Sequence, residues 1–297
     1  MTQVEIEAAD QRVGVDLVGG GLRSYAAGGR ELLDGYAAGE RATSGRGQVL
    51  IPWPNRLEDG AYDFDGRSHR LPLNEPERGN AIHGLVRDAA WRVAEKNAQR
   101  VVLEHELEPQ DGYPFALSVR IEYELSERGL SVQTTATNVG QEACPYGAGQ
   151  HPYLTLGTPE VDSLILSAPG ATLLRVDERG LPVGREPVEG SEHDFRLPQE
   201  IGATILDHAF TDLERGVDGL ARVELRDRKS RAGLTLWVDA SYRYLQLFTG
   251  DPLPDVSRRS LAVEPMTCPA NAFRTGEDLI RLEPGACATS VWGIVPG

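Results

Sequence analysis

The sequence predicts an all-β protein, built as a large antiparallel sandwich. Short segments in which apolar and polar residues alternate recur along the chain, and no long segment sustains a helical period. Glycine and proline are frequent, at 33 and 19 of 297 residues, whereas aromatic residues make up only 6%. Alternation is typical of half-buried strands, and glycine and proline mark turns. Because helices long enough to connect parallel strands are not indicated, we expect the strands to pair antiparallel.

The clearest strand covers 117–125, where apolar and polar residues alternate without a break. A turn signal, Glu127-Arg128-Gly129, follows it, and 130–137 then continues with many β-branched residues. This order predicts a hairpin with one buried and one solvent-facing side.

Further strands are predicted from shorter apolar runs. They cover 101–107, 221–225, 234–238, 244–248 and 290–295. The best helical pattern covers 205–213, and it is short. Because the sequence has no internal repeat, low-complexity tract or linker, we expect a single domain over 1–297.

Charge and cysteine content narrow the function. The formal net charge of −15 and the pI near 4.9 would repel phosphate backbones and anionic membranes, so we expect neither a nucleic-acid nor a membrane partner. The negative electrostatic potential of such a chain also disfavours an anionic substrate, unless arginines gather around the binding site. Three scattered cysteines without CxxC spacing predict neither a disulfide framework nor a zinc site. Since neither a signal peptide nor a membrane span is indicated, we expect a cytoplasmic protein.

The segment 147–153, Gly-Ala-Gly-Gln-His-Pro-Tyr, places His151 between flexible glycines and a rigid proline. Proline cannot continue a central strand, so the segment is expected to leave a sheet and hold the imidazole at its rim. Histidine titrates near neutrality, so His151 is a candidate proton donor or acceptor. The alternative is a hydrogen-bonded histidine with a purely structural role.

Three other turn-rich segments hold polar side chains beside prolines or glycines. The first is a stiff connection that would present Trp53, Asn55 and Arg56, and the second contains His83. In the third, Glu264 follows an apolar run and precedes Pro265, so we expect it to end a strand. A carboxylate at the edge of a buried sheet can have a raised pKa and act as a base. Surface ion pairing or turn filling would equally account for each residue alone.

Metal and cofactor motifs are missing from the sequence. The histidines lack the close spacing of a zinc helix, and there is no HExxH, GxSxG, P-loop or GxGxxG pattern. We therefore predict histidine and glutamate chemistry with no metal and no cofactor.

Taken in order, the motifs resemble those of the aldose 1-epimerase (galactose mutarotase) family over nearly the whole chain. The matching pieces are Pro54-Asn55-Arg56 with Gly60 and Tyr62, Ile82-His83-Gly84 with Trp91, 112–115, Asn138, 149–153, 206–210, 246–250 and 263–267. The resemblance implies a β-supersandwich with an open sugar cleft. It also implies conversion between the α- and β-anomers of a free aldose without a cofactor.

The resemblance further implies individual roles. Glu264 resembles the general base of the family and His151 its general acid, so that one removes the proton of the anomeric hydroxyl while the other protonates the ring oxygen. The positions that match sugar contacts in the family are Asn55, Arg56, His83, Asp207 and Gln246. Asp212 lies close to Asp207 and is an alternative for that position.

Some features leave the substrate open. Many relatives have an aspartate a few residues after the catalytic glutamate, where this chain has Pro269-Ala270-Asn271. A hexose-6-phosphate mutarotase would need cationic residues, to which Arg56, Arg78 and Arg87 could contribute. A noncatalytic sugar-binding module is a further alternative, although the presence of both His151 and Glu264 argues against it. The sequence indicates no oligomeric state.

Overall fold

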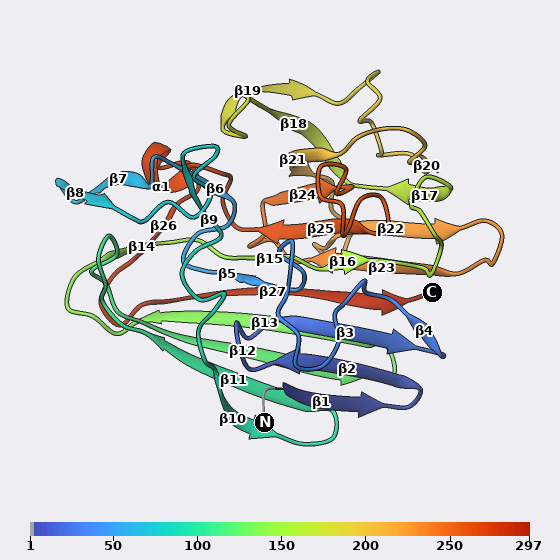
Figure 1. The fold of residues 1–297 in the computed structure, drawn as a ribbon, viewed down its shortest axis with the longest axis horizontal. Helices are drawn as coiled ribbons and strands as arrows, with labels where there is room; N and C mark the ends of the chain where they lie inside the picture. The colour runs from blue at the N-terminus through green and yellow to red at the C-terminus, as the bar shows by residue number, and fades with distance from the viewer. Residues whose placement is uncertain (1–2) are drawn as a thin grey trace.

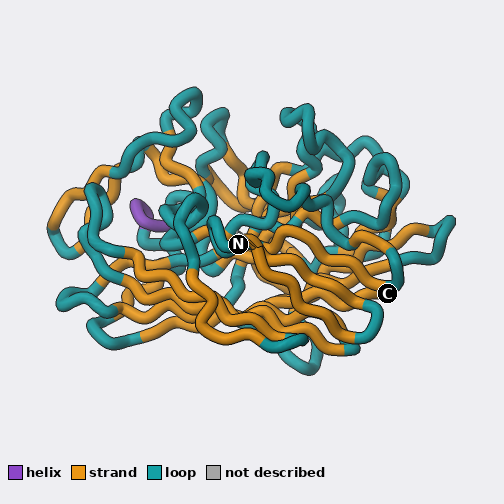
Figure 2. Tube along the Cα trace, turned by 60° about the horizontal axis from the view of Figure 1, so that its bottom comes forward, coloured by secondary structure: helices purple, strands orange, loops and turns teal. Residues whose placement is uncertain are grey.

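The computed structural model describes residues 3–297 and confirms the all-β prediction. Two large sheets form the body of the protein, and their strands pair antiparallel throughout (Figure 1). Loops gather on one side of the molecule, opposite the long strands (Figure 2). Within the described residues there is one α-helix, α1 (Ala272–Thr275). No helix among residues 3–297 has the length and apolar composition needed to cross a membrane.

The nine-stranded sheet has the spatial order β10 (Arg92–Lys96), β11 (Arg100–Leu107), β12 (Leu117–Ser126), β13 (Gly129–Asn138), β27 (Cys287–Pro296), β23 (Gly233–Val238), β22 (Ala221–Asp227), β17 (Leu164–Ser167) and β20 (Gln199–Glu200). The eight-stranded sheet has the order β19 (Pro182–Pro187), β18 (Gly170–Val176), β21 (Asp207–Leu213), β24 (Tyr244–Phe248), β25 (Leu261–Met266), β15 (Gly149–Gln150) and β5 (Val49–Leu50), with β16 (Tyr153–Leu154) also paired to β25.

The remaining strands form smaller sheets. The first contains β1 (Gln3–Ala8), β2 (Gln11–Asp16), β3 (Leu22–Ala27) and β4 (Arg30–Glu31). The others are the pairs β6 (Arg56–Glu58) with β9 (Asn80–Ile82), β7 (Ala61–Phe64) with β8 (Arg67–Arg70), and β14 (Cys144–Tyr146) with β26 (Ile280–Leu282).

The predicted hairpin is confirmed as β12 and β13, which pair from Leu117↔Asn138 to Ser126↔Gly129. Along β12 the apolar side chains are buried and most of the polar ones are at least partly exposed, as the alternation indicated. The same core contains side chains from Val4 to Ile294. The single domain over 1–297 stays a prediction.

The best helical pattern of the sequence, 205–213, does not form a helix, because Asp207–Leu213 form β21. Leu206, Ala209, Phe210 and Leu213 have the spacing of one helix face, which explains the pattern. In the structure, β21 pairs with β18 on one side and β24 on the other. The backbone hydrogen bonds and packing of a central strand outweigh the local helical pattern.

Candidate active site

Three neighbouring strands bring Glu264, Gln246 and Asp207 together. Glu264 on β25 lies directly opposite Gln246 on β24. Gln246 Nε2 donates a hydrogen bond of 2.8 Å to Oδ1 of Asp207 on β21. Paired residues, and alternate residues of one strand, face the same side of a sheet; Asp207 lies opposite Phe248, two residues from Gln246, so these three polar groups face the same side.

Glu264 lies inside β25 and not at its end, which corrects the sequence expectation. The N–H groups of Val263 and Thr267 donate to Pro152 and Ala148, on the β15 and β16 side of the strand. Alternate residues of a strand point the same way, so the nitrogen of Pro265 faces this side too. Opposite Pro265, the neighbouring segment between β15 and β16 is not a strand and forms no ladder pair. The missing N–H of proline therefore removes no hydrogen bond that the sheet would otherwise make.

His151 lies in this segment between β15 and β16. Its N–H donates to the carbonyl of Gln48 at 3.0 Å, and its own carbonyl accepts from Gly47 at 2.9 Å. The imidazole stacks on the ring of Tyr153, with centroids 5.0 Å apart and planes at 11°. These contacts leave Nε2 at 3.3 Å from Oε1 of Glu264. The sequence expectation of a held imidazole beside a sheet agrees with this geometry, although the residue is 5% exposed and not at an open rim.

His83 comes from a different part of the chain. β6 pairs with β9, and the His83 N–H donates to the carbonyl of Asn55 at 3.0 Å. Both residues have positive φ, of 64° and 56°, a conformation that asparagine and histidine adopt more readily than most residues. The His83 ring meets the His151 ring edge to face, with centroids 5.4 Å apart.

His83, His151 and Glu264 therefore form one cluster, in which the candidate ligand atoms all lie within 4.8 Å of one another. Two imidazoles and a carboxylate are ligand types that zinc accepts, so these residues are the ones that would hold a metal ion. The same cluster can move protons, since Nδ1 of both histidines and Oε2 of Glu264 have no hydrogen-bond partner in the described residues.

Burial sets the protonation of the pair. It lowers the pKa of His151 to about 3 and raises that of Glu264 well above its ordinary value, with the charge of Asp207 raising the latter further. It also lowers the pKa of His83, to which the neighbouring His151 contributes. Burial thus favours the neutral form of both groups, which is the tautomer with the proton on Glu264.

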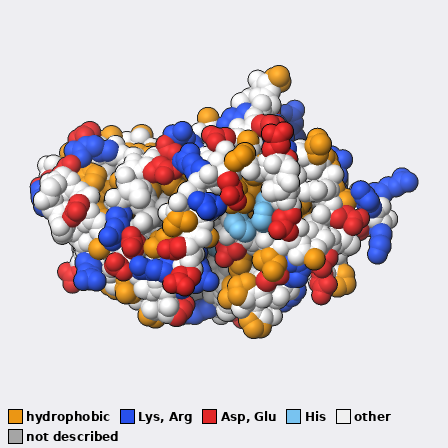
Figure 3. Space-filling view, turned by 90° about the horizontal axis from the view of Figure 1, so that it is seen from above, with side chains coloured by type: hydrophobic (Ala, Val, Ile, Leu, Met, Phe, Trp, Pro, Cys, Tyr) orange, Lys and Arg blue, Asp and Glu red, His pale blue; other side chains and the backbone are white. Residues whose placement is uncertain are grey.

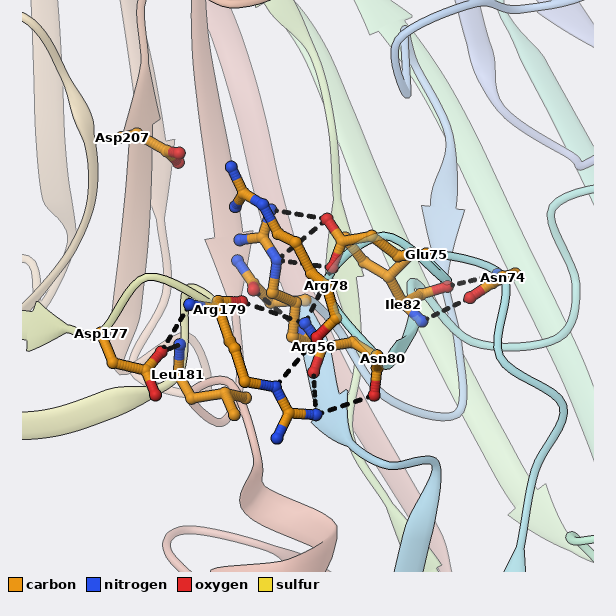
Figure 4. Close-up of polar contacts among 12 residues, drawn as sticks. Arg56, Asn74, Glu75, Arg78, Asn80, Ile82, Asp177, Arg179, Leu181 and Asp207 are labelled. Carbon is orange, nitrogen blue, oxygen red and sulfur yellow. Dashed lines mark hydrogen bonds and ion pairs between the residues drawn. The ribbon is translucent and has the colours of Figure 1, made fainter.

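Arg56 is held by Glu75, as Figure 4 shows. Nε and Nη2 of Arg56 donate three hydrogen bonds of 2.9–3.2 Å to the Glu75 carboxylate, which also accepts one from Asn80 at 2.9 Å. Burial acts to lower the pKa of Arg56, but the hydrogen bonds and charge of Glu75, together with the charges of Asp207 and Glu264, outweigh it and the pKa is raised. Nη1 lies against Gly180, where a Cβ would come within 2.7 Å. The guanidinium is thus fixed with one amino group toward the pocket.

The pocket beside these residues has a volume of about 340 Å³, including space open to solvent. Its polar lining is Asn55, Arg56, Asp207 and Gln246, and the rest is mostly apolar: Leu174, Val176, Gly180, Pro182, Ala209 and Ala270. In the space-filling view, histidine side chains are visible in a hollow between acidic and basic groups (Figure 3).

Most of the residues expected from the sequence come together here, but two differ. Trp53 is only 3% exposed and packs against Phe273, with ring centroids 5.5 Å apart, so it belongs to the core. Asp212 is exposed, whereas Asp207 lines the pocket. Sequence reasoning missed Glu75. It had no signal of its own, because any of many carboxylates could have paired with Arg56.

Comparisons with known proteins identify the family. A sequence model of the aldose 1-epimerase family matches residues 2–292. The chain belongs to the aldose 1-epimerase family. It is therefore an isomerase of the mutarotase type, with the fold of the galactose mutarotases.

Individual relatives cover different shares of the chain. The uncharacterized protein YihR of Escherichia coli K12 is 35% identical over 283 residues, 95% of this chain and 89% of that protein. The galactose mutarotase of Rattus norvegicus is 32% identical over 168 residues, 52% of this chain and 46% of that protein. A GalM/aldose epimerase homologue from C. elegans has a TM-score of 0.89 at 18% identity, covering 99% of this chain and 98% of that one.

Proposed function

We propose that this aldose 1-epimerase interconverts the α- and β-anomers of a free aldohexose, with Glu264 as the base and His151 as the acid. The observation that carries the proposal is the 3.3 Å separation of Nε2 and Oε1 beside a pocket lined by Asp207 and Gln246. The anomeric hydroxyl and the ring oxygen are both bonded to C1. Two groups this close together can therefore serve both oxygens at once.

The proton count of the pair fits a reversible ring opening. Opening starts with ionised Glu264 and the imidazolium form of His151. Glu264 takes the proton of the anomeric hydroxyl and His151 gives one to the ring oxygen, so the step ends with a protonated carboxyl and a neutral imidazole. That end state is the one that burial favours in the free protein. The pair holds one shared proton before and after the step. The tautomer with the proton on His151 opens the ring, and the tautomer with the proton on Glu264 closes it. Rotation about C1–C2 in between exposes the other face of the aldehyde.

The remaining polar groups would orient the sugar. Arg56, fixed by Glu75, and the Gln246 amide, fixed by Asp207, are preorganised donors toward the pocket. Asn55 accepts the N–H of Arg56 on its side chain at 2.8 Å, which fixes the start of β6. His83 would hold the sugar next to His151. Such positioning adds to catalysis because the entropy cost of orienting the sugar is met on binding and not in the transition state.

Polarimetry on freshly dissolved α-glucose and α-galactose tests the proposal. We expect Glu264→Gln to lower kcat by at least about 100-fold, since one positioned base contributes roughly 10²- to 10⁴-fold. Glu124→Gln, on the exposed side of β12, is the matched control and should leave kcat unchanged. The proposal fails if the wild type gives the rate of buffer alone on every free aldohexose, or if Glu264→Gln matches the wild type.

One observation favours a second candidate, a hexose that carries a 6-phosphate. Arg56 is paired with Glu75 and Arg87 with Asp88, but Arg78 has no carboxylate within 4.0 Å among residues 3–297. It lies beside Arg56 and Glu75 (Figure 4). If the substrate is anionic, Arg78→Gln lowers kcat/KM for glucose 6-phosphate at least 10-fold and leaves that for glucose unchanged. Equal effects on both sugars would exclude this candidate.

A further inference from the structure

A short segment, 43–47, crosses the ring of His151, and we call it the strap. The Gly45 backbone lies so close to the imidazole that a Cβ there would come within 2.7 Å of Cδ2 and 2.9 Å of Nε2. Real Cβ atoms do not approach ring atoms this closely, so only glycine fits. The strap therefore lies against the ring edge that contains Cδ2 and Nε2.

Main-chain bonds fix the strap to the histidine segment. Gly47 donates to the carbonyl of His151 at 2.9 Å, and the Tyr153 hydroxyl donates to the carbonyl of Ser44 at 2.7 Å. Tyr153 is also the residue on which His151 stacks. The imidazole is thus enclosed between the strap on one edge and the tyrosine ring on one face.

Most side-chain contacts of the strap go to one carboxylate, and Asp34 adds an ion pair of 3.8 Å with Nη2 of Arg46. Asp255 accepts hydrogen bonds from Thr43 at 2.7 Å, from Ser44 at 2.8 Å and from Nη1 of Arg46 at 3.0 Å, and its carbonyl accepts from Nη2 at 2.8 Å. Arg46 is buried, with 6% exposure, and its guanidinium lies 6.0 Å from the centroid of the Tyr153 ring. Asp255 therefore contacts three of the five strap residues.

The position of Asp255 in the chain links the strap to the strand that carries Glu264. Asp255 lies in the loop that joins β24 to β25, the two strands that carry Gln246 and Glu264. The same hairpin thus holds the base from one side and, through the strap, the acid from the other. A shift of the strap would change the distance between the two catalytic groups.

We propose that Asp255 and Gly45 are positioning residues of the reaction: Asp255 fixes the strap, and the strap holds the His151 imidazole against Glu264 and keeps water from it. The proposal rests on the proposed function for its catalytic part. Its structural part, the exclusion of water from the imidazole, does not depend on which substrate the protein binds.

Two matched pairs of variants test it. Gly45→Ala adds a methyl group against the ring, and Gly39→Ala is its control, because Gly39 has a similar positive φ of 86° against 78° but no atom within 4 Å of the place that a Cβ would take. Asp255→Asn removes the charge that holds the strap. Asp251→Asn is its control, because Asp251 lies in the same loop and accepts from Thr249 and Arg258 without touching the strap.

Kinetics give the first readout. We expect Gly45→Ala to lower kcat at least 10-fold with KM within 3-fold, since a displacement of about 1 Å can cost roughly 100-fold. Asp255→Asn should lower kcat about 5-fold, and both controls should stay within 2-fold of the wild type. Equal kcat values within each pair would overturn the positioning role. Thr43→Val, which removes one hydrogen bond, provides a milder variant if Asp255→Asn does not fold.

The second readout needs no substrate. The charged and titratable groups that face the His151 ring are Glu264, His83 and Tyr153, with Arg46 behind Tyr153. If the strap covers the ring, diethyl pyrocarbonate at one fixed pH modifies His151 at least 10-fold faster in Asp255→Asn than in the wild type, as mass spectrometry of the His151 peptide measures. An equal rate of His151 modification in the two proteins would overturn the enclosure, whether or not the protein is an active mutarotase.

Discussion

Nε2 of His151 lies 3.3 Å from Oε1 of Glu264, and burial lowers the pKa of the imidazole and raises that of the carboxyl, which favours the uncharged form of each. The two groups therefore share one proton and titrate as a pair. This relationship governs the dependence of both activity and stability on pH.

The activity should not fall as the pH is lowered from 7 to 5. Burial lowers the pKa of His151 to about 3, so the pair gains its second proton only near that pH and not near the ordinary value of about 6.5. At the alkaline side, activity should fall as the pH passes the raised pKa of Glu264. Polarimetric kcat/KM between pH 5 and 9, corrected for the buffer rate, checks this. An acid limb with its midpoint near 6.5 would contradict it.

Glu264→Gln should stabilise the protein, increasingly so as the pH rises. A carboxyl whose folded pKa is raised contributes full stability below its unfolded pKa and loses it as the pH rises toward the folded value. The amide does not ionise, so the difference in unfolding free energy should grow by up to about 1.4 kcal/mol per pH unit above pH 4.5. Urea unfolding at pH 5 and pH 8 measures it. A difference that does not change with pH would show that Glu264 is ionised in the folded protein.

Asp207→Ala should raise KM about 10-fold, with a smaller effect on kcat. It removes the acceptor that fixes the Gln246 amide in the pocket, while the acid and base pair keeps its geometry. Asp212→Ala, on the same strand but exposed, should change neither constant by more than 2-fold. If the two variants exchange these effects, the sugar contact belongs to Asp212.

Glu75→Gln should destabilise the protein by about 3–5 kcal/mol. The Arg56 and Glu75 side chains are 13% and 12% exposed, and removing one partner leaves a buried charge unpaired. Glu142→Gln breaks an exposed pair with Arg67 and should cost less than about 1 kcal/mol. Chemical denaturation of both variants gives the comparison. Similar losses would mean that water reaches Arg56 and replaces Glu75.

Local sequence patterns predicted the strands that are specified by residues close together in the chain. The alternation in 117–125 and the turn at Gly129 specify the β12–β13 hairpin, because side-chain period and turn geometry are properties of neighbouring residues. Such patterns were not sufficient at β21, where two neighbouring strands overrode a short helical spacing of apolar residues. They also failed at Pro265, since only the position of β15 and β16 shows which edge of β25 lacks a partner.

The sequence by itself determined the fold class, the family and the residue types available for catalysis, since motifs such as 149–153 and 263–267 are read without knowing their neighbours in space. Only the tertiary structure decided which groups meet. It placed Glu264 against His151, Glu75 against Arg56 and Asp255 against the strap. These contacts join residues far apart in the chain, and their pKa shifts and hydrogen bonds come from burial and distance, which arise only when the sheets are assembled.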